Sequence, residues 1–215
     1  ITGIGKIACG AYHTMFVPSS SSASYNSGEV YTHGHNGFGQ LGRPTAGASS
    51  TAIPSNSSMR FDATNVAEIS AGAEHSAVLK TDGNLYVFGK NREGQLGRGN
   101  KIDDNLNLTS PVTPFTNVSK ASLGNLNSAY IDTSDKLYTF GYNYYYQLGD
   151  GTTTLRTVPT DVFDNIKDVS LGSYHTLMLS GSTTTGNLYG FGYNYSKQIN
   201  TTTSADQIDP YLIST

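Results

Sequence analysis

The sequence predicts an all-β fold built from repeats, and three observations support this. A glycine that closes a short aromatic segment recurs at positions 34, 89, 141 and 192, and a period of about fifty residues is typical of repeat architectures. The 215 residues include 24 glycines and 15 tyrosines, a composition that favours turns and strands. Charged residues make up only 13% of the chain, which argues against disorder, since disordered chains carry high charge and few aromatic residues.

Each repeat is predicted to contain two strands and a loop of fixed pattern. In the first repeat, residues 7–17 alternate enough to predict one strand that ends at Pro18. This segment contains Gly-x-x-His, and Asn127 replaces the histidine in the third repeat only. A turn, a second strand of the form Leu-Tyr-x-Phe-Gly and the loop Asn-x-x-x-Gln-Leu-Gly follow, clearest at 85–97. The repeats therefore cover residues 7–42, 69–97, 121–149 and 169–200 of one domain, residues 1–215.

The connecting segments differ in length and composition. Residues 19–28 form a longer hairpin connection than the compact Asp82-Gly83 turn, which predicts an insertion at a hairpin tip, where insertions cost least. The connectors at 98–120 and 150–168 contain prolines, and because proline is tolerated at sheet edges, we expect short edge strands there. Residues 201–215 resemble these connectors and lead to no further pair of strands.

The invariant residues of the repeat have a structural explanation. Gly89 ends a strand where a side chain would collide with a neighbouring sheet or block the turn. Asn91 is expected to adopt unusual backbone angles and to bond its own turn, while Gln95 bonds backbone groups and Leu96 enters the core. Cys9 aligns with apolar residues of the other repeats, so we expect a small core residue rather than a reactive thiol. A single cysteine also allows no internal disulfide.

Several function classes are disfavoured by what the sequence lacks. The net charge of −3 offers no broad basic surface for nucleic acid. No apolar run is long enough to cross a membrane, and no signal peptide is visible. The chain has no nucleophile elbow, phosphate-binding loop or zinc-protease motif. We therefore expect no enzyme, no catalytic residues and no cofactor.

The fixed residues resemble a known family. Gly-x-x-His-Ser/Thr followed by Tyr-x-aromatic-Gly-x-Asn-x-x-x-Gln-Leu-Gly is similar to the repeat of the regulator of chromosome condensation 1 (RCC1) family. The resemblance covers almost the whole chain and implies an RCC1-like β-propeller of four-stranded sheets, with seven sheets in the complete ring. Kelch repeats have a similar period, but their Gly-Gly pairs are missing here. The family's tryptophan before the strand-ending glycine is replaced by His33, Phe88, Phe140 and Phe191.

Four repeats are too few to close a seven-bladed ring. The resemblance therefore implies a partial or open propeller, which is a segment of a longer chain or is capped by another chain, because unpaired sheet edges invite association. In a propeller, His13, His75 and His175 occupy one position in different sheets, so we expect hydrogen-bonding roles and no metal site. His33 is expected to be partly packed, and His35 to lie in an exposed loop.

The loop after each strand-ending glycine is the candidate binding site, because its sequence varies within a fixed frame. Six tyrosines of the third and fourth copies are expected to cluster on one face, and tyrosine is a favoured contact residue. Packing between sheets is the alternative for some of these rings. The candidate binding residues are Tyr142, Tyr144, Tyr145, Tyr193, Tyr195, Phe38 and Arg92.

Asn-x-Ser/Thr triplets give candidate glycosylation sites at Asn56, Asn107 and Asn117. Chance in a chain rich in serine, threonine and asparagine explains them equally well. The triplets lean towards a secreted or cell-surface setting, whereas the absence of disulfides fits the cytoplasm.

Three functional hypotheses follow. The first is a non-enzymatic scaffold that binds a protein partner through the loop face. The second is guanine nucleotide exchange on a small GTPase, which the family resemblance implies without residues that can be matched. The third is a secreted enzyme inhibitor or a cell-surface structural protein. Fold alone does not decide among them.

Overall fold

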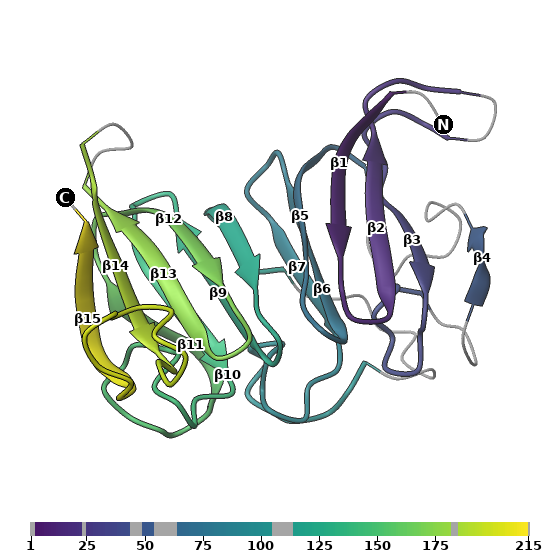
Figure 1. Cartoon of the computed structure of the whole chain (residues 1–215). Helices are drawn as coiled ribbons and strands as arrows, with labels where there is room; N and C mark the ends of the chain where they lie inside the picture. Colours follow the sequence, from purple (N-terminus) through teal and green to yellow (C-terminus); the bar gives the residue numbers. More distant parts are fainter. Residues whose placement is uncertain are drawn as a thin grey trace. The chain divides into compact units, whose positions relative to one another are not determined.

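A computed structural model describes residues 3–22, 25–43, 64–104, 114–181 and 185–214, together with the backbone of 49–53. These residues contain fifteen strands and no helix (Figure 1). Every strand pair is antiparallel, which agrees with the predicted all-β fold. The chain forms two compact units, residues 1–92 with 102–118 and residues 93–101 with 119–215. Each unit contains two sheets, and the expected single domain of residues 1–215 stays a prediction.

The first unit holds one sheet of four strands and one of three. The four-stranded sheet has the order β1-β2-β3-β4, and the three-stranded sheet has the order β5-β6-β7. At the free edge of β7, Leu85 pairs with Phe115 through an isolated bridge, so part of the connector lies where a fourth strand is expected. The strands are β1 (Ile4–Cys9), β2 (His13–Pro18), β3 (Tyr31–Gly34), β4 (Ser49–Ile53), β5 (Val66–Ala71), β6 (His75–Lys80) and β7 (Leu85–Gly89).

The second unit holds two four-stranded sheets, with the orders β11-β10-β9-β8 and β12-β13-β14-β15. The outer strand β11 contains Pro159, which confirms the predicted edge strand of that connector. The outer strand β15 contains Pro210 in the same way. The strands are β8 (Val118–Leu123), β9 (Asn127–Asp132), β10 (Leu137–Gly141), β11 (Arg156–Phe163), β12 (Ile166–Leu171), β13 (His175–Ser180), β14 (Asn187–Gly192) and β15 (Gln207–Ser214).

The two units build their cores from the same positions of the repeat. In the first unit, Met15 and Val17 pack with Val78 and Phe88. The second unit packs the equivalent residues, which are Ala129 and Ile131 against Met178 and Phe191. One face of each leading sheet thus meets the opposite face of the sheet that follows it. Because period-two alternation separates the faces, a given repeat position has the same packing role in both units.

The single strand predicted over residues 7–17 is wrong. The structure has two strands, β1 and β2, separated by a turn at Gly10 whose amide donates to the His13 carbonyl at 2.8 Å. A Cβ on Gly10 would lie 2.2 Å from Cε1 of the His13 ring. The glycine of Gly-x-x-His therefore gives the histidine ring room to fold back over the turn, and this breaks the strand.

The expectation that Cys9 is a core residue is also wrong, because Cys9 is exposed. Cys9 pairs with Thr14, whereas the neighbouring Ala8 pairs with the core residue Met15. Alternation along β1 therefore directs Cys9 to the face opposite the one that carries Met15. Ile7, on the same face as Cys9, is 75% exposed.

Candidate protein-binding surface

The loops after the strand-ending glycines are held by their own asparagine and glutamine side chains. Asn143 Oδ1 accepts from the Leu148 amide at 2.9 Å, and its Nδ2 donates to the Thr152 carbonyl at 2.8 Å. Gln147 Oε1 accepts from the Tyr145 amide at 2.9 Å. Leu148 is fully buried. The predicted roles of this pattern are confirmed, except that none of the repeat asparagines has positive φ.

The strand-ending glycine is required for two reasons at Gly89. Its φ is +117°, a value that side chains disfavour, and a Cβ there would lie 2.7 Å from the Glu74 carbonyl oxygen and 3.2 Å from Cα of Gln40. The predicted collision with a neighbouring segment is therefore confirmed. In the loop that follows Gly89, Arg92 is exposed, Glu93 is half-buried and Gly94 is buried.

A further link joins each loop to the next repeat. The hydroxyl that follows the Gly-x-x-His histidine donates to the backbone carbonyl of the preceding repeat's glutamine. Ser76 Oγ donates to the Gln40 carbonyl at 2.7 Å. The matching distances are 2.7 Å from Ser128 to Gln95 and 2.8 Å from Thr176 to Gln147. The loop frame is thus fixed from both sides by residues that recur in the repeat.

In the second unit, six tyrosine rings form one continuous cluster. Tyr145 makes edge contacts with the rings of Tyr144, Tyr174 and Tyr193 at centroid distances of 5.1, 5.2 and 5.0 Å. The outer rings, Tyr144 and Tyr195, are 64% and 72% exposed. We call this set the tyrosine platform; its members are Tyr142, Tyr144, Tyr145, Tyr174, Tyr193 and Tyr195.

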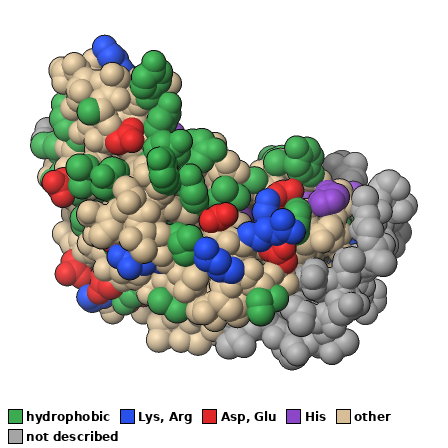
Figure 2. Space-filling view, turned by 90° about the horizontal axis from the view of Figure 1, so that it is seen from below, with side chains coloured by type: hydrophobic (Ala, Val, Ile, Leu, Met, Phe, Trp, Pro, Cys, Tyr) green, Lys and Arg blue, Asp and Glu red, His purple; other side chains and the backbone are tan. Residues whose placement is uncertain are grey.

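The platform lies on the loop side of its unit. Strand β14 runs towards the lower edge of Figure 1, so the loop that follows it lies on the side viewed in Figure 2, where hydrophobic side chains form part of the surface. Burial raises the pKa of the Tyr142 phenol, and the neighbouring Tyr145 and Glu93 add to that shift. The Tyr142 phenol is therefore neutral at physiological pH and acts as a hydrogen-bonding group within the packed rings.

The structure changes the membership of the expected cluster. Tyr146 was expected in it, but its backbone has φ 63° and it makes none of the ring contacts seen among the described residues. Tyr174 was not expected, because it belongs to the Gly-x-x-His segment rather than to the variable loop. The signal was present in the sequence, since Tyr174 directly precedes the histidine, and the turn at Gly172 places that residue beside the loops.

The first unit has a charged version of the same surface. The ring of Phe38 lies 5.0 Å from Lys90 Nζ and 5.4 Å from Arg92 Cζ, so the structure brings the two predicted residues Phe38 and Arg92 together. Lys90 pairs with Glu74 at 2.5 Å. A hollow of about 280 Å³ beside these groups is lined by Tyr12, His35 and Glu74.

The histidines have the expected structural roles where their contacts are seen. His13 Nε2 lies 2.8 Å from Ser76 Oγ. His33 is half-buried and its ring tilts on Phe16 at 5.7 Å. His35 is half-buried rather than exposed, and its Nδ1 accepts from Gln40 Nε2 at 2.9 Å. Among the described residues, no group of three or more His, Cys, Asp or Glu side chains is arranged to hold a metal ion.

Of the three candidate glycosylation sites, only Asn117 belongs to the described part of the chain; Asn56 and Asn107 lie outside it. Asn117 is exposed, with φ 59°, and Asn65 and Asn165 have φ 55° and 59° at the same position of their repeats. Asparagine tolerates this left-handed conformation better than other side chains. The conformation explains why asparagine stands there, and glycosylation of Asn117 stays a prediction.

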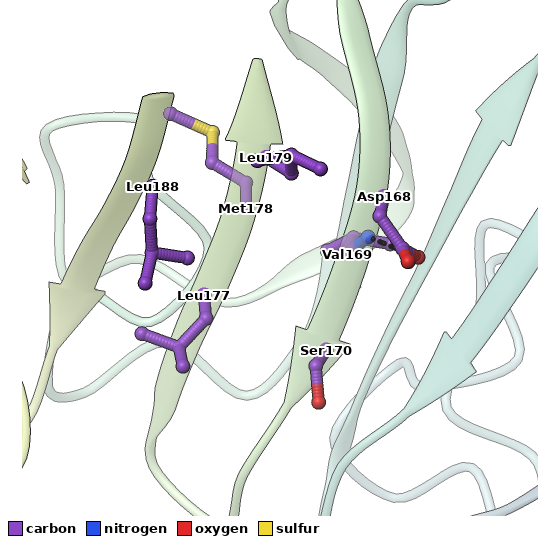
Figure 3. Close-up of a pocket in the computed structure, with 7 residues that line it drawn as sticks. All are labelled: Asp168, Val169, Ser170, Leu177, Met178, Leu179 and Leu188. Carbon is purple, nitrogen blue, oxygen red and sulfur yellow. Dashed lines mark hydrogen bonds between the residues drawn. The ribbon is translucent and has the colours of Figure 1, made fainter. Parts of the chain in front are cut away.

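An apolar hollow marks one face of the β12–β15 sheet. It measures about 250 Å³ and is lined by residues of β12, β13 and β14 (Figure 3). Leu177, Leu179 and Leu188 stand at the positions that Ala129, Ile131 and Leu137 occupy in the preceding sheet, where they are fully buried against β12–β14. The same positions are only half-buried in the β12–β15 sheet.

Antiparallel sheets of three or four strands, repeated with a period near fifty residues and joined by loops of one fixed frame, define a repeat protein of the β-propeller class. The described residues contain no helix long and apolar enough to cross a membrane. The model of the regulator of chromosome condensation (RCC1) repeat matches residues 27–79, 82–131 and 134–179. The chain belongs to the RCC1 repeat family. Each matched repeat runs from one sheet into the next, since residues 27–79 span β3 to β6.

Two curated relatives illustrate the range of proteins that carry these repeats. The chain is 32% identical over 214 residues to the ultraviolet-B receptor UVR8 of Arabidopsis thaliana, covering 98% of this chain and 46% of the receptor. It is 26% identical over 217 residues to the probable E3 ubiquitin-protein ligase HERC4 of Homo sapiens, covering 98% of this chain and 19% of that protein. The chain thus spans less than half the length of these relatives.

Solved structures agree on the fold. Human WBSCR16 superimposes with a TM-score of 0.75 at 20% identity, over 98% of this chain and 52% of that one. Yeast RCC1 (Prp20), solved in complex with Kap60, gives a TM-score of 0.76 at 20% identity, over 99% of this chain and 49% of that one. The fold is that of the RCC1-like β-propellers, as predicted.

Proposed function

We propose that this chain is a non-enzymatic interaction module that binds a protein partner through the tyrosine platform. The observation that carries the proposal is the contrast within the cluster. Tyr145 is packed among four other rings, whereas Tyr144 and Tyr195 project from this base with most of their surface exposed. Exposed tyrosines on a rigid base offer large contact area with little entropy to lose on binding.

The family relationship supports a role in protein recognition. The yeast relative was solved bound to Kap60, and another structure of it was studied for binding to Gsp1p and histones. Those partners belong to that protein. For this chain they support only a partner-binding role, and the non-enzymatic part of the proposal rests on the absence of catalytic motifs in the sequence.

The test compares the chain with a variant that carries Tyr144→Ser and Tyr195→Ser. The unchanged chain is used to capture its partner from an extract of the source organism. We expect the double variant to lose this partner. A matched control is Tyr211→Ser, on the outer strand β15, whose ring is 37% exposed. If the double variant has an unchanged melting temperature and still retains the partner, the tyrosine platform is not the binding site.

Guanine nucleotide exchange is the alternative function that the family resemblance supports. Release of mant-GDP from a panel of small GTPases measures it directly. Acceleration that is lost in the Tyr144→Ser, Tyr195→Ser variant would identify the partner as a GTPase. Acceleration that this variant keeps would place exchange on another surface.

We also propose that a further sheet, from other repeats of the chain or from another chain, covers the hollow on the β12–β15 sheet. The equivalent positions of the preceding sheet are covered in this way. Leu177→Lys tests it in the full-length natural protein. If the face is covered, the variant loses at least about 2 kcal/mol of stability, because a charge is buried without a partner; a loss below about 0.5 kcal/mol would show that the face is open to water.

A further inference from the structure

The loops of the two units carry different side chains at equivalent positions of the repeat. In the first unit, the residue four places after the strand-ending glycine is Phe38. In the next loop, the residues one and three places after Gly89 are Lys90 and Arg92. The two cations lie against the Phe38 ring at 5.0 and 5.4 Å. The residue four places after one strand-ending glycine therefore contacts the residues one and three places after the strand-ending glycine of the next repeat.

The charges of this surface are balanced within the first unit. Lys90 pairs with Glu74 at 2.5 Å, and Arg92 pairs with Asp103 at 3.0 Å. Each cation therefore has both an aromatic ring and a carboxylate. Such sites combine a ring quadrupole with an ion pair, and both interactions favour a cation over a neutral group.

The second unit has the carboxylate and the rings but lacks the cation. Glu93 stands four places after Gly89, the position of Phe38, and the residues one and three places after Gly141 are Tyr142 and Tyr144. Because the ring of Phe38 contacts the residues one and three places after the next glycine, the equivalent Glu93 belongs beside Tyr142 and Tyr144. Burial of the Tyr142 phenol raises its pKa, and the Glu93 charge adds to that shift. No Lys, Arg or His of the described chain forms an ion pair with Glu93.

The rings beside Glu93 are arranged to receive a flat cation. Tyr142 and Tyr144 are close to parallel, with an interplanar angle of 18° and centroids 6.5 Å apart. Tyr144 is 64% exposed, so its ring is accessible to a partner. Lys197, the one basic residue in the platform loops, belongs to the loop that follows β14, whereas Glu93 lies beside the loop that follows β10. A basic group of a partner is therefore favoured at the Glu93 end.

We propose that the tyrosine platform receives an arginine side chain of its protein partner, with the guanidinium paired to Glu93 and resting against Tyr142 and Tyr144. Arginine fits better than lysine, because its planar guanidinium bonds a carboxylate with two N–H groups and stacks on aromatic rings at the same time. The inference rests on the proposed function, since it names the chemistry that the same platform recognises.

The probe is a short acetylated and amidated peptide, Gly-Arg-Gly, compared with Gly-Lys-Gly and with the uncharged isostere Gly-citrulline-Gly. Binding is followed by NMR shifts of ring-labelled tyrosine in the full chain. We expect saturable shifts at Tyr142 and Tyr144 with the arginine peptide, weaker shifts with the lysine peptide and none with the citrulline peptide. Equal shifts with arginine and citrulline would overturn the proposal, as would the absence of any shift with arginine.

Glu93→Gln removes the carboxylate and keeps the shape of the side chain. We expect it to weaken binding of the arginine peptide by about tenfold to a hundredfold, the range of one hydrogen bond to a charged group. Asp209→Asn is the matched control, because it removes one exposed carboxylate from β15 in the same unit; we expect unchanged binding. Equal binding by the Glu93→Gln variant and the unchanged chain would contradict the assigned role of Glu93.

The two proposals fail in different ways. If partner capture depends on Tyr144 and Tyr195 but not on Glu93, and the peptides do not distinguish arginine from citrulline, then the platform binds a partner without arginine recognition. If capture is independent of both tyrosines, then the platform itself is not the binding site. Melting temperatures of all variants within about two degrees of the unchanged chain, the range of a surface substitution, exclude misfolding as the cause.

Discussion

His13 Nε2 lies 2.8 Å from Ser76 Oγ, and Ser76 Oγ in turn donates to the Gln40 carbonyl at 2.7 Å. Because the only hydroxyl proton of Ser76 goes to that carbonyl, Nε2 of His13 must be the protonated nitrogen. The imidazole is therefore the Nε2–H tautomer, and it donates from one repeat to a hydroxyl of the next. The three groups form one buried chain of hydrogen bonds between two repeats.

Removal of the hydroxyl breaks this chain at its centre. We expect Ser76→Ala to cost about 1–3 kcal/mol of stability, because a buried N–H and a buried carbonyl both lose their partner. Urea denaturation measures the change. Ser134→Ala, at an exposed turn position, is the control, with an expected change within about 0.5 kcal/mol. Equal effects of the two substitutions would show that the hydrogen-bond chain contributes nothing measurable.

The stability of the protein should fall as the pH drops below the ordinary range of histidine. Burial lowers the pKa of His13 from 6.5 to about 4; the charge of Glu74 opposes this shift, and that of His35 adds to it. Above pH 6.5, His13 is neutral in both the folded and the unfolded chain, and its contribution is complete. Between pH 6.5 and 4 only the unfolded chain takes up the proton, so the free energy of unfolding falls by about 3 kcal/mol.

The measurement is chemical denaturation at half-unit steps from pH 7.5 to 4, with the variant His13→Asn as reference. Asparagine occupies this position in the third repeat and does not titrate. As the pH falls through this window, we expect the unfolding free energy of the unchanged chain to decrease relative to that of the variant. A difference that is constant from pH 7.5 to 4 would show that His13 does not carry the pH dependence.

Asn127 lacks the partner that histidine has in the first repeat. It is fully buried, and neither its Oδ1 nor its Nδ2 has a hydrogen-bond partner in the described chain. The hydroxyl that corresponds to Ser76 is that of Thr176, which donates to the Gln147 carbonyl at 2.8 Å. The amide side chain of Asn127 is shorter than an imidazole, so the hydrogen-bond chain between these two repeats lacks the donor that His13 supplies in the first repeat.

We therefore expect Asn127→His to stabilise the protein by about 1 kcal/mol, the net value of one buried hydrogen bond. Gly124 leaves room for the ring, as Gly10 does for His13. The gain should disappear when Thr176→Val is added, because the ring then has no hydroxyl to reach. Thermal and urea denaturation of the four chains of this cycle measure the coupling. A gain that survives Thr176→Val would mean that the ring stabilises by packing alone.

Periodic features of this protein could be predicted from its sequence, while features of a single repeat could not. The strand-ending glycines and the Asn and Gln of the loop recur with fixed spacing, and their geometry requires those residue types. By contrast, Cys9 aligns with Ala71, which packs against the core, whereas Cys9 itself is exposed because the core of this unit lies against the other face of its sheet. Alignment gives the position of a residue in its repeat but not which sheet covers it.

The tyrosine platform could likewise be predicted in part from the sequence. The aromatic character of the loops was evident from the sequence, and the structure groups five of the six predicted tyrosines through ring contacts. Tyr174 joins them from another segment because it directly precedes β13, which pairs with β14, and its carbonyl accepts from the Tyr193 amide at 2.8 Å. Tyr146 is absent from the platform because its position requires a left-handed backbone, which the sequence reveals only through Gly39 and Gly94 in the other copies.

That left-handed position gives a further prediction at Lys197. Gly39 and Gly94 have φ 82° there, and Lys197 has φ 58°. A non-glycine residue in this region costs about 1–2 kcal/mol, and the greater freedom of glycine in the unfolded chain returns about half of that. Because Lys197 is exposed, its side chain contributes little packing. We expect Lys197→Gly to raise the free energy of unfolding by about 0.5–1 kcal/mol.

Lys197→Ala separates backbone strain from the loss of the lysine side chain. Alanine meets the same steric penalty at positive φ as lysine does, so we expect no stabilisation from it. Urea denaturation of the two variants beside the unchanged chain gives the comparison. If alanine stabilises as much as glycine, the benefit comes from removing the positive charge near the other loop residues, and the backbone at this position is not strained.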